Sequence, residues 1–340
     1  MTTIVEVAQK ANVSISTVSR VLNNSSHKVN KATREKVERA IEELDYRPNA
    51  LAQSLLKKRS MTIGIILPDI SNPYYAEIVR GIQDKANEKN YSVLIQNTDL
   101  RMDRIERSIY DLREKYADGL IFAGGLFHIP KFIPIMKNLA SRAVVIGRCG
   151  GSFPAVRVDN VAAAFLAVSH LVELGYREIA FINGVTGSST MTDRLKGFKK
   201  AVKYYRCPFC PEFVLTGATT PEGGYTRTKT LIALKHRPRA IILANDQMAF
   251  GAVKAIRNAG LKILQDIALI GFDNIPLCSY FEPPITSIEI PRYELGGAAM
   301  EMLIELIENG QTEQIRWFKV ELIKRRSTVL TRDTARRALS

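Results

Sequence analysis

The segment Val13-Ser14-Ile15-Ser16-Thr17-Val18-Ser19-Arg20-Val21-Leu22-Asn23 decides the fold of the N-terminal part of the chain. Its apolar residues recur at helical spacing and predict a single stripe on a short helix, made of Val18, Val21 and Leu22. The side chains off this stripe are Ile15, Ser16, Thr17, Ser19 and Arg20. Short hydroxyls bond phosphates and an arginine forks to guanine, so this helix suits the DNA major groove. An ordinary amphipathic helix with small polar residues outside is the alternative.

Two further helices are expected around this segment. Thr3 and Glu6 fit a capping box at the start of the first helix, and Asn12 suits a left-handed turn at its end. Ser14 or Ser16 can cap the second helix and Asn30 the third. The inward side chains are expected to be Ile4, Val7, Ala8 and Ala11 in the first helix, and Val37, Ala40, Ile41 and Leu44 in the third. Three short helices with a tight first turn make a helix-turn-helix.

The charge of the chain is uneven. The 340 residues carry a formal net charge of +14. Residues 1–60 hold 11 Lys and Arg against 6 Asp and Glu, a net charge of +5, and the other 280 residues hold 37 against 28, a net charge of +9. A basic N-terminal unit favours a nucleic-acid partner, although a solvated basic face is the commoner cause of such an excess.

Composition excludes several classes of protein. No apolar run reaches the ~18 residues of a membrane span, and the first residues lack the basic-then-apolar pattern of a secretory signal. Four cysteines in a chain of this length do not make a disulfide scaffold. We therefore expect a cytoplasmic protein with no membrane association.

Residues 4–8, 13–23 and 46–52 together resemble the lactose-repressor/galactose-repressor (LacI/GalR) family of regulators, in order and in spacing. The family often has Gly where this chain has Asn12, a residue that can adopt the same turn. The resemblance implies that Ile15, Ser16 and Arg20 read bases. It implies phosphate contacts for Thr17, Ser19 and Asn23. It also implies a hinge helix over 49–56 that orders only on operator DNA and contacts it through Asn49, Ala52 and Leu55, the last wedged into the minor groove. An ordinary linker or core leucine is the alternative for Leu55.

From Met61 onward the pattern alternates between short apolar runs and amphipathic segments. We expect strands at 62–67, 92–95, 119–122, 143–146, 179–182, 213–215, 240–243 and 267–270, with one final strand over 317–323. We expect helices from about 73, through 105–112, and over 160–174, 191–204, 246–259 and 293–308. Such alternation predicts parallel sheets flanked by helices, and ~270 residues are too many for one sheet of ordinary size. Two similar α/β lobes are therefore expected.

The resemblance adds boundaries to this prediction. It covers nearly the whole chain and includes a second strong match over 244–251 and 270–274. It implies a helix-turn-helix domain over 1–48, a hinge and linker over 49–60, and a periplasmic-binding-protein-like core over 61–330 of two doubly wound lobes. Lobe 1 would span about 61–158 and 289–319, lobe 2 about 159–288 and 320–330, leaving 331–340 as a tail. A homodimer on near-palindromic double-stranded operator DNA is also implied, since one recognition helix reads few base pairs.

Polar side chains that follow the predicted strands are candidates for a ligand site, because open α/β sheets bind ligands at the carboxyl ends of their strands. Asp69 follows the first strand and Asp273 follows the strand at 267–270. The resemblance implies effector contacts for Tyr74, Tyr75, Ser188, Thr190, Arg194 and Asp273. An aspartate after a strand can instead cap the next helix, which is the role that we favour for Asp246. Asp159, Asn160 and Asn245 are expected to be caps or to face the cleft.

Enzyme motifs are absent from the sequence. It contains no G-x-x-x-x-G-K-[ST], no G-x-G-x-x-G after a strand and no G-x-S-x-G elbow. Its four histidines have no metal-ligand spacing, and Cys207-Pro208-Phe209-Cys210 lies in a predicted loop rather than at a helix start, where a reactive thiolate is favoured. We therefore expect no catalytic residue, no metal and no cofactor.

The expected function is that of a DNA-binding transcriptional regulator, a repressor, controlled by a small molecule between the two lobes. The effector could be a sugar, a sugar phosphate, a nucleobase or a protein partner. The +9 of the core would suit an anionic effector, raise nonspecific affinity for DNA, or have no functional meaning. The alternative is a solute-binding protein or a sugar-modifying enzyme with an incidental basic N-terminus.

Overall fold

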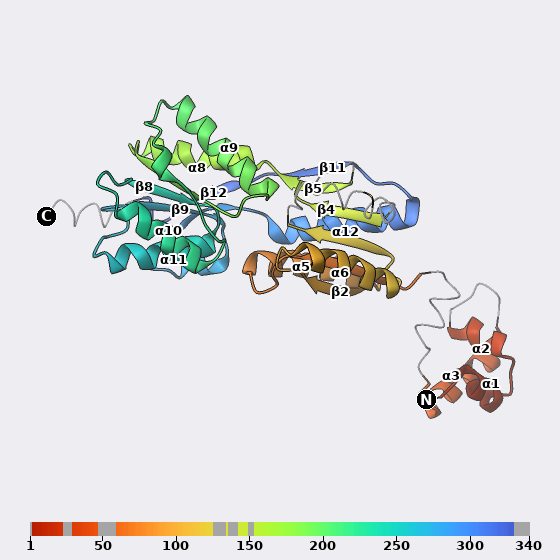
Figure 1. Cartoon of the computed structure of the whole chain (residues 1–340). Helices are drawn as coiled ribbons and strands as arrows, with labels where there is room; N and C mark the ends of the chain where they lie inside the picture. The colour runs from red at the N-terminus through yellow and green to blue at the C-terminus, as the bar shows by residue number, and fades with distance from the viewer. Residues whose placement is uncertain are drawn as a thin grey trace. The chain divides into compact units, whose positions relative to one another are not determined.

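The computed structural model describes residues 2–22, 29–46, 59–124, 134, 142–148 and 153–329. The chain divides into two compact units, residues 1–61 and residues 62–340, and each is described by itself. Figure 1 shows the helical first unit and the larger second unit of two sheets with their helices.

The first unit holds three helices, α1 (Ile4–Ala11), α2 (Ile15–Leu22) and α3 (Lys31–Glu43). The predicted capping box is present, with Thr3 N donating to Glu6 Oε2 at 2.7 Å and Glu6 N donating to Thr3 Oγ1 at 3.4 Å. Asn12 ends α1 in the left-handed region at φ 52°, as its sequence context predicts. The predicted helix-turn-helix is therefore confirmed, including the cap at Asn30.

A small apolar core holds these helices together. Its buried members come from all three helices: Val7, Ala8, Ala11, Val18, Val21, Val37 and Ala40. Two polar links join its first and last helices, an ion pair of 2.7 Å between Lys10 and Glu43 and a hydrogen bond of 3.0 Å from Thr2 Oγ1 to the carbonyl of Leu44. Such a small core leaves the outer face of α2 available for contacts.

The second unit contains two six-stranded sheets, each the centre of one lobe. The lobe 1 sheet has the order β11-β5-β4-β3-β1-β2 and the lobe 2 sheet the order β12-β10-β9-β8-β6-β7. The lobe 1 strands are β1 (Thr62–Leu67), β2 (Ser92–Asn97), β3 (Gly119–Ala123), β4 (Ala143–Ile146), β5 (Ala155–Val158) and β11 (Ile315–Phe318). The lobe 2 strands are β6 (Ile179–Asn183), β7 (Val214–Thr216), β8 (Ala240–Leu243), β9 (Ala268–Asp273), β10 (Thr286–Glu289) and β12 (Glu321–Ile323). The two expected α/β lobes are confirmed.

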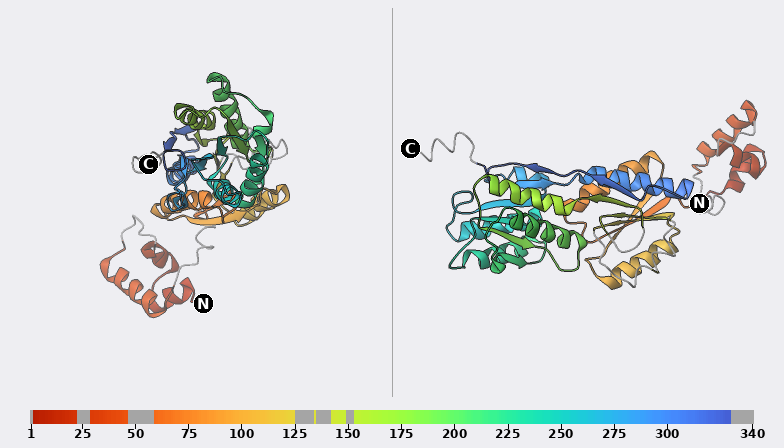
Figure 2. Two further views of the ribbon diagram at one scale, coloured as in Figure 1. Left: turned by 90° about the vertical axis from the view of Figure 1, so that its left-hand side faces the viewer. Right: turned by 90° about the horizontal axis from the view of Figure 1, so that it is seen from above.

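Helices cover both faces of each sheet. In lobe 1, α5 (Pro73–Glu88) and α12 (Arg292–Asn309) pack on each other on one face, and α6 (Met102–Glu114) covers the other (Figure 2). In lobe 2, α8 (Asn160–Glu173) and α9 (Ser189–Tyr204) lie on one face, and α10 (Pro221–Ile232) and α11 (Asp246–Asn258) on the other (Figure 1). Burial on both faces explains why the central strands read as continuous apolar runs.

The predicted final strand over 317–323 is wrong. Its first part belongs to β11, which pairs with β5 in lobe 1, and its second part to β12, which pairs with β10 in lobe 2. β12 is also the one antiparallel member of either sheet among the described strands. The chain passes between the lobes at three places, after β5, after β10 and after β11. These crossings set the two sheets end to end.

Candidate functional sites

The outer face of α2 presents the side chains that were predicted to contact DNA. Ile15 is 48% exposed, and Ser16 and Arg20 are also exposed. Thr17 and Ser19 are half-buried. Ser14 caps the helix by accepting a hydrogen bond from Thr17 N at 3.2 Å. An arginine and short hydroxyls close to the start of a helix match the chemistry of a recognition helix.

Part of the predicted DNA contact set lies outside the described residues. Asn23 and the hinge segment 49–56, with Asn49, Ala52 and Leu55, belong to this part, and their roles stay predictions.

A cavity of about 290 Å³ lies between the two lobes, and every predicted effector residue lines it. The seven are Asp69, Tyr74, Tyr75, Ser188, Thr190, Arg194 and Asp273. The volume is close to the lower end of the range for small-molecule sites, about 300–1,000 Å³. The strand orders explain the position, because successive strands are added toward one edge of the sheet up to β2 and toward the other edge from β3 onward, and lobe 2 shows the same reversal between β6 and β8. Ligand sites of doubly wound sheets lie at such switch points.

Lobe 1 contributes the loop after β1 and the start of α5. Asn72 caps α5 by accepting from Tyr74 N at 3.0 Å, and Asp69 accepts from Ser71 N at 2.9 Å. The rings of Tyr74 and Tyr75 meet edge to face, with centroids 5.0 Å apart. Burial, with the nearby charge of Asp273, raises the pKa of Tyr74 to about 12, so this hydroxyl stays a neutral donor.

Close packing around Tyr75 requires a glycine in the opposite wall. Gly124 follows β3 with φ +89°, and a Cβ there would stand 2.6 Å from the Tyr75 hydroxyl and 3.0 Å from Pro68. Any other residue would therefore be strained in its backbone and would push this tyrosine out of place.

Lobe 2 contributes Arg194, whose guanidinium is held on every side. Nε donates to Asn160 Oδ1 at 3.0 Å, Nη1 donates to the carbonyl of Ala244, and Nη2 donates to Asp273 Oδ1 at 3.4 Å. The guanidinium also lies over the ring of Phe272, 4.3 Å from its centroid. Ser188 caps α9, the helix that positions Arg194. The side chains of the Arg194–Asp273 pair are only 4% and 8% exposed, so the pair is part of the cavity wall.

Asp273 sits at the end of β9 in a left-handed conformation, with φ 99°. Burial raises its pKa to about 6, although the charges of Arg194 and Arg292 act in the opposite direction. A carboxyl of this kind changes charge near neutral pH, so its bond to Arg194 depends on pH.

The cap predicted at Asp246 is wrong. Asn245 caps α11 by accepting from Met248 N at 2.9 Å, and Asp246 is the first residue of the helix. The Asp246 carboxyl is fully buried and accepts from Ser287 Oγ at 2.6 Å and from Ile275 N at 2.8 Å. Burial and the charge of Asp273 raise its pKa to about 7. Asp246 therefore links the start of α11 to β10 and to the loop after β9.

Several wall residues escaped the prediction. Asp99 and Leu100 line the cavity with φ 50° and 58°, and Thr219 and Thr220 do so from the loop after β7. The rule about strand ends would have found Asp99, because β2 runs to Asn97 rather than to residue 95. Thr219 and Thr220 precede α10, which has no clear apolar stripe in the sequence.

Contacts also join the two lobes at the edge of the cavity. Arg148, after β4, pairs with Asp193 of α9 at 2.8 Å, and its carbonyl accepts from Ser189 Oγ at 2.7 Å. Arg292 of α12, which pairs at 2.8 Å with Glu77 of α5 in its own lobe, donates across to the carbonyl of Asn274 in lobe 2 at 3.3 Å. A change in the angle between the lobes must therefore break polar contacts.

The described part of the chain holds no group of three or more His, Cys, Asp or Glu arranged to hold a metal ion. Burial raises the pKa of the Cys207 thiol, which is the opposite of what a redox-active C-x-x-C needs. In the same described ranges, no helix is long and apolar enough to cross a membrane.

Comparison with known proteins agrees with this architecture. Residues 3–49 match the family model described as bacterial regulatory proteins, lacI family, and residues 168–328 match a periplasmic binding protein-like domain. The HTH-type transcriptional regulator RegA of Clostridium saccharobutylicum is 34% identical over 96% of this chain and 99% of its own length. The chain belongs to the LacI family. As in its LacI-family relatives, it is a DNA-binding transcriptional regulator with an effector-binding core.

Solved LacI-family structures extend the similarity to three dimensions. The lac repressor dimer bound to operator and an anti-inducer superposes with a TM-score of 0.88 at 29% identity, covering 97% of this chain and 99% of that one. The complex of the transcriptional regulator CelR with cellobiose has a TM-score of 0.72 at 28% identity, covering 96% and 100%.

Proposed function

We propose that this LacI-family member is a homodimeric repressor whose effector is an uncharged, polyhydroxylated molecule of the sugar class. The observation that carries the proposal is the charge of the cavity wall. Its described residues include three carboxylates, Asp69, Asp99 and Asp273, against one guanidinium, Arg194, which is already bound to Asp273. A phosphate group would meet repulsion there, whereas hydroxyl groups would find acceptors.

The rest of the wall suits a sugar. Tyr74 and Tyr75 offer aromatic surface, and Asn160, Ser188 and Thr190 offer amide and hydroxyl groups at the cavity. The CelR complex supports this class, since its ligand is the uncharged sugar cellobiose. The basic excess of the core, which suggested an anionic effector, therefore requires another explanation.

Control of DNA binding would act through the angle between the lobes. A ligand that bridges Asp69 in lobe 1 and Arg194 in lobe 2 favours one arrangement of the lobes over the other, and only such a differential contact can shift the equilibrium. In a two-fold dimer this shift would change the distance between the two copies of α2 and of the hinge segment 49–56.

The test has two stages. Operator sequences are first selected from random DNA by the full-length protein, and a panel of sugars, nucleosides and their phosphate esters is then screened by thermal shift and by release or tightening of operator binding. We expect a neutral sugar to stabilise the protein and its phosphate ester to have no effect. Preference for a phosphate ester over its neutral parent would refute the effector class.

A pair of matched variants tests the site itself. Asp69→Asn removes a carboxylate that faces the cavity, and Asp103→Asn removes one from the exposed first turn of α6 in the same lobe. We expect only Asp69→Asn to lower the affinity for the effector, while both variants bind operator DNA with the affinity of wild type. Equal effector affinity in the two variants would remove Asp69 from the site.

A further inference from the structure

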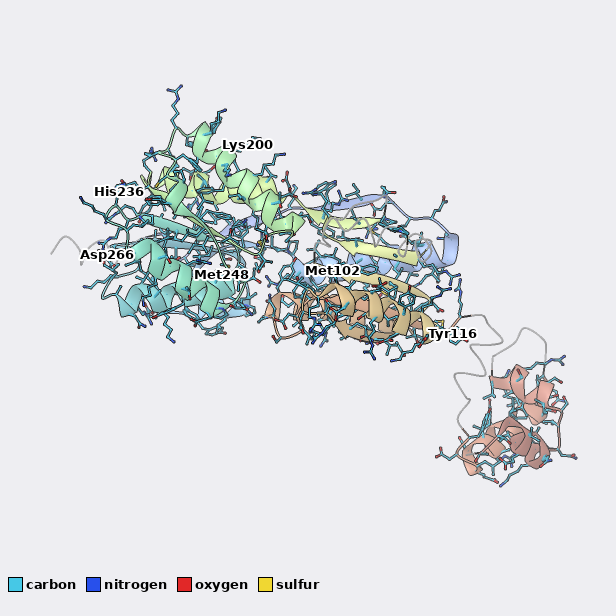
Figure 3. The ribbon with its side chains drawn as sticks, viewed as in Figure 1. Met102, Tyr116, Lys200, His236, Met248 and Asp266 are labelled. Carbon is cyan, nitrogen blue, oxygen red and sulfur yellow. The ribbon has the colours of Figure 1, made fainter. Side chains whose placement is uncertain are left out.

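Part of the positive charge of the core lies on the outer face of α9. Four lysines recur at the spacing i, i+3, i+4 and i+7, which places them on one side of a helix, and all four are exposed. We name them the α9 lysine stripe: Lys196, Lys199, Lys200 and Lys203. Figure 3 shows Lys200 on the side of α9 that faces away from the lobe 2 sheet. The sequence has no acidic residue between Asp193 and Glu212 to neutralise them.

No acidic side chain in the described ranges forms an ion pair with the α9 lysine stripe. The nearest acid along the helix, Asp193, pairs with Arg148 of lobe 1 at 2.8 Å. The neighbouring helix α8 has Glu173 alone, at its last residue. Like charges three and four residues apart destabilise a helix, so the stripe is costly for folding and is unexplained by the effector cavity, whose wall is acidic.

An exposed aromatic ring lies beside the stripe. Tyr204 is 71% exposed and follows Lys200 by four residues, so the two side chains are neighbours on the helix surface. Its ring is held in place by Tyr205, at 4.9 Å between centroids and nearly perpendicular, and by Phe165 of α8 at 5.5 Å. A large ring that is both exposed and fixed is the kind of side chain that dominates protein–protein interfaces.

We infer that the α9 lysine stripe and Tyr204 form a docking surface for an acidic helical segment of a partner protein. Carboxylates at the spacing i, i+3, i+4 and i+7 on such a segment would face the four lysines, and one apolar side chain would cover the Tyr204 ring. Double-stranded DNA offers phosphates but no apolar partner for that ring, so a protein segment fits both features. The same helix supplies Thr190 and Arg194 to the cavity, so a docked partner and the effector would act on one rigid element.

The experiment measures fluorescence anisotropy of a labelled helical peptide that carries four Glu at this spacing and one Leu, titrated with the full-length protein. Lys199→Gln/Lys200→Gln/Lys203→Gln is expected to weaken binding about tenfold. Tyr204→Ala is expected to weaken it about fivefold. The matched control removes three exposed lysines elsewhere on lobe 2, Lys229→Gln/Lys235→Gln/Lys262→Gln, and is expected to change affinity less than about twofold.

The outcomes separate specific docking from attraction by net charge. A larger loss in the stripe variant than in the control variant, together with a loss in Tyr204→Ala, supports the surface. An equal loss in both lysine variants, or no loss in Tyr204→Ala, overturns it. A stripe variant that loses affinity for a short non-operator duplex more than for the peptide also overturns it and assigns the stripe to DNA.

Discussion

Replacement of Arg194 by methionine tests how the cavity wall is held together. Methionine is unbranched and apolar, fills a similar space and keeps a favourable contact with the ring of Phe272, but it removes the positive charge beside Asp273. Because the Asp273 side chain is only 8% exposed, its carboxylate would be left buried without a cation. Breaking a buried pair in this way costs about 3–5 kcal/mol of the free energy of unfolding.

The stability that Arg194→Met loses relative to wild type should depend on pH. A carboxyl whose pKa is higher in the folded than in the unfolded chain loses stability as pH rises through the interval between the two values. Asp273 has a folded pKa of about 6 against an ordinary value of 3.8, and loss of Arg194 raises the folded value further. At pH 8, where the Asp273 carboxyl is ionised, we therefore expect the full loss of about 3–5 kcal/mol in the free energy of unfolding. At pH 5 Asp273 carries a proton in both proteins, and only the lost hydrogen bonds to Asn160 and Ala244 remain, about 1–3 kcal/mol.

Urea unfolding of wild type and Arg194→Met at pH 5 and pH 8 measures both values. The double variant Arg194→Met/Asp273→Asn is the control, because it has no buried charge to leave unpaired. We expect it to recover part of the stability at pH 8 and to cost no more there than at pH 5, because wild type itself loses stability as Asp273 ionises. The reasoning fails if Arg194→Met is equally destabilised at pH 5 and pH 8, or if Asp273→Asn gives no recovery.

Four further predictions concern other parts of the molecule. Arg20→Ala should weaken specific operator binding by about 1–3 kcal/mol in a filter or gel assay and leave nonspecific binding nearly unchanged; equal losses would contradict base reading. Gly197→Ala should lower the free energy of unfolding by about 1–3 kcal/mol, because a Cβ there would stand 2.2 Å from the carbonyl of Val161. Gly297→Ala, where a Cβ meets only ordinary contacts, should instead raise it by about 0.5–1 kcal/mol in the same urea experiment. Asp246→Asn should flatten the loss of stability that wild type shows from pH 5 to pH 8, since the folded pKa of Asp246 is about 7; an unchanged profile would exclude Asp246 as its source.

The features that the sequence predicted best are those set by residues close to one another in the chain. The capping box at Thr3 and the left-handed turn at Asn12 depend on contacts within a few residues, so they can be recognised without the rest of the fold. The cavity residues were also predictable, because strand ends of parallel sheets converge at one edge. Asp69 and Asp273 were found by this rule.

The errors have tertiary causes. The sequence prediction missed α10. Its buried face consists of Gly224, Thr228 and Leu231, which is too polar to show the apolar spacing of a helix. The segment 317–323 has a uniform pattern, and only the positions of β5 and β10 in space divide it between two sheets. Asp246 satisfies the rule for a cap, but Asn245 takes that role and leaves the carboxyl to bind Ser287, 41 residues away.

The three crossings between the lobes have a consequence for synthesis of the protein on the ribosome. Lobe 1 begins at β1 but lacks α12 and its edge strand β11 until residue 318 has been made, and the lobe 2 sheet lacks β12 until residue 323. A growing chain can complete the small helical unit of residues 1–61 early, since all its helices are contiguous. The nascent core, by contrast, must keep the apolar face that α12 later covers away from other chains until α12 has been made. Nascent chains of this protein are therefore expected to depend on chaperones until β12 has been made, when both lobes can close almost at once.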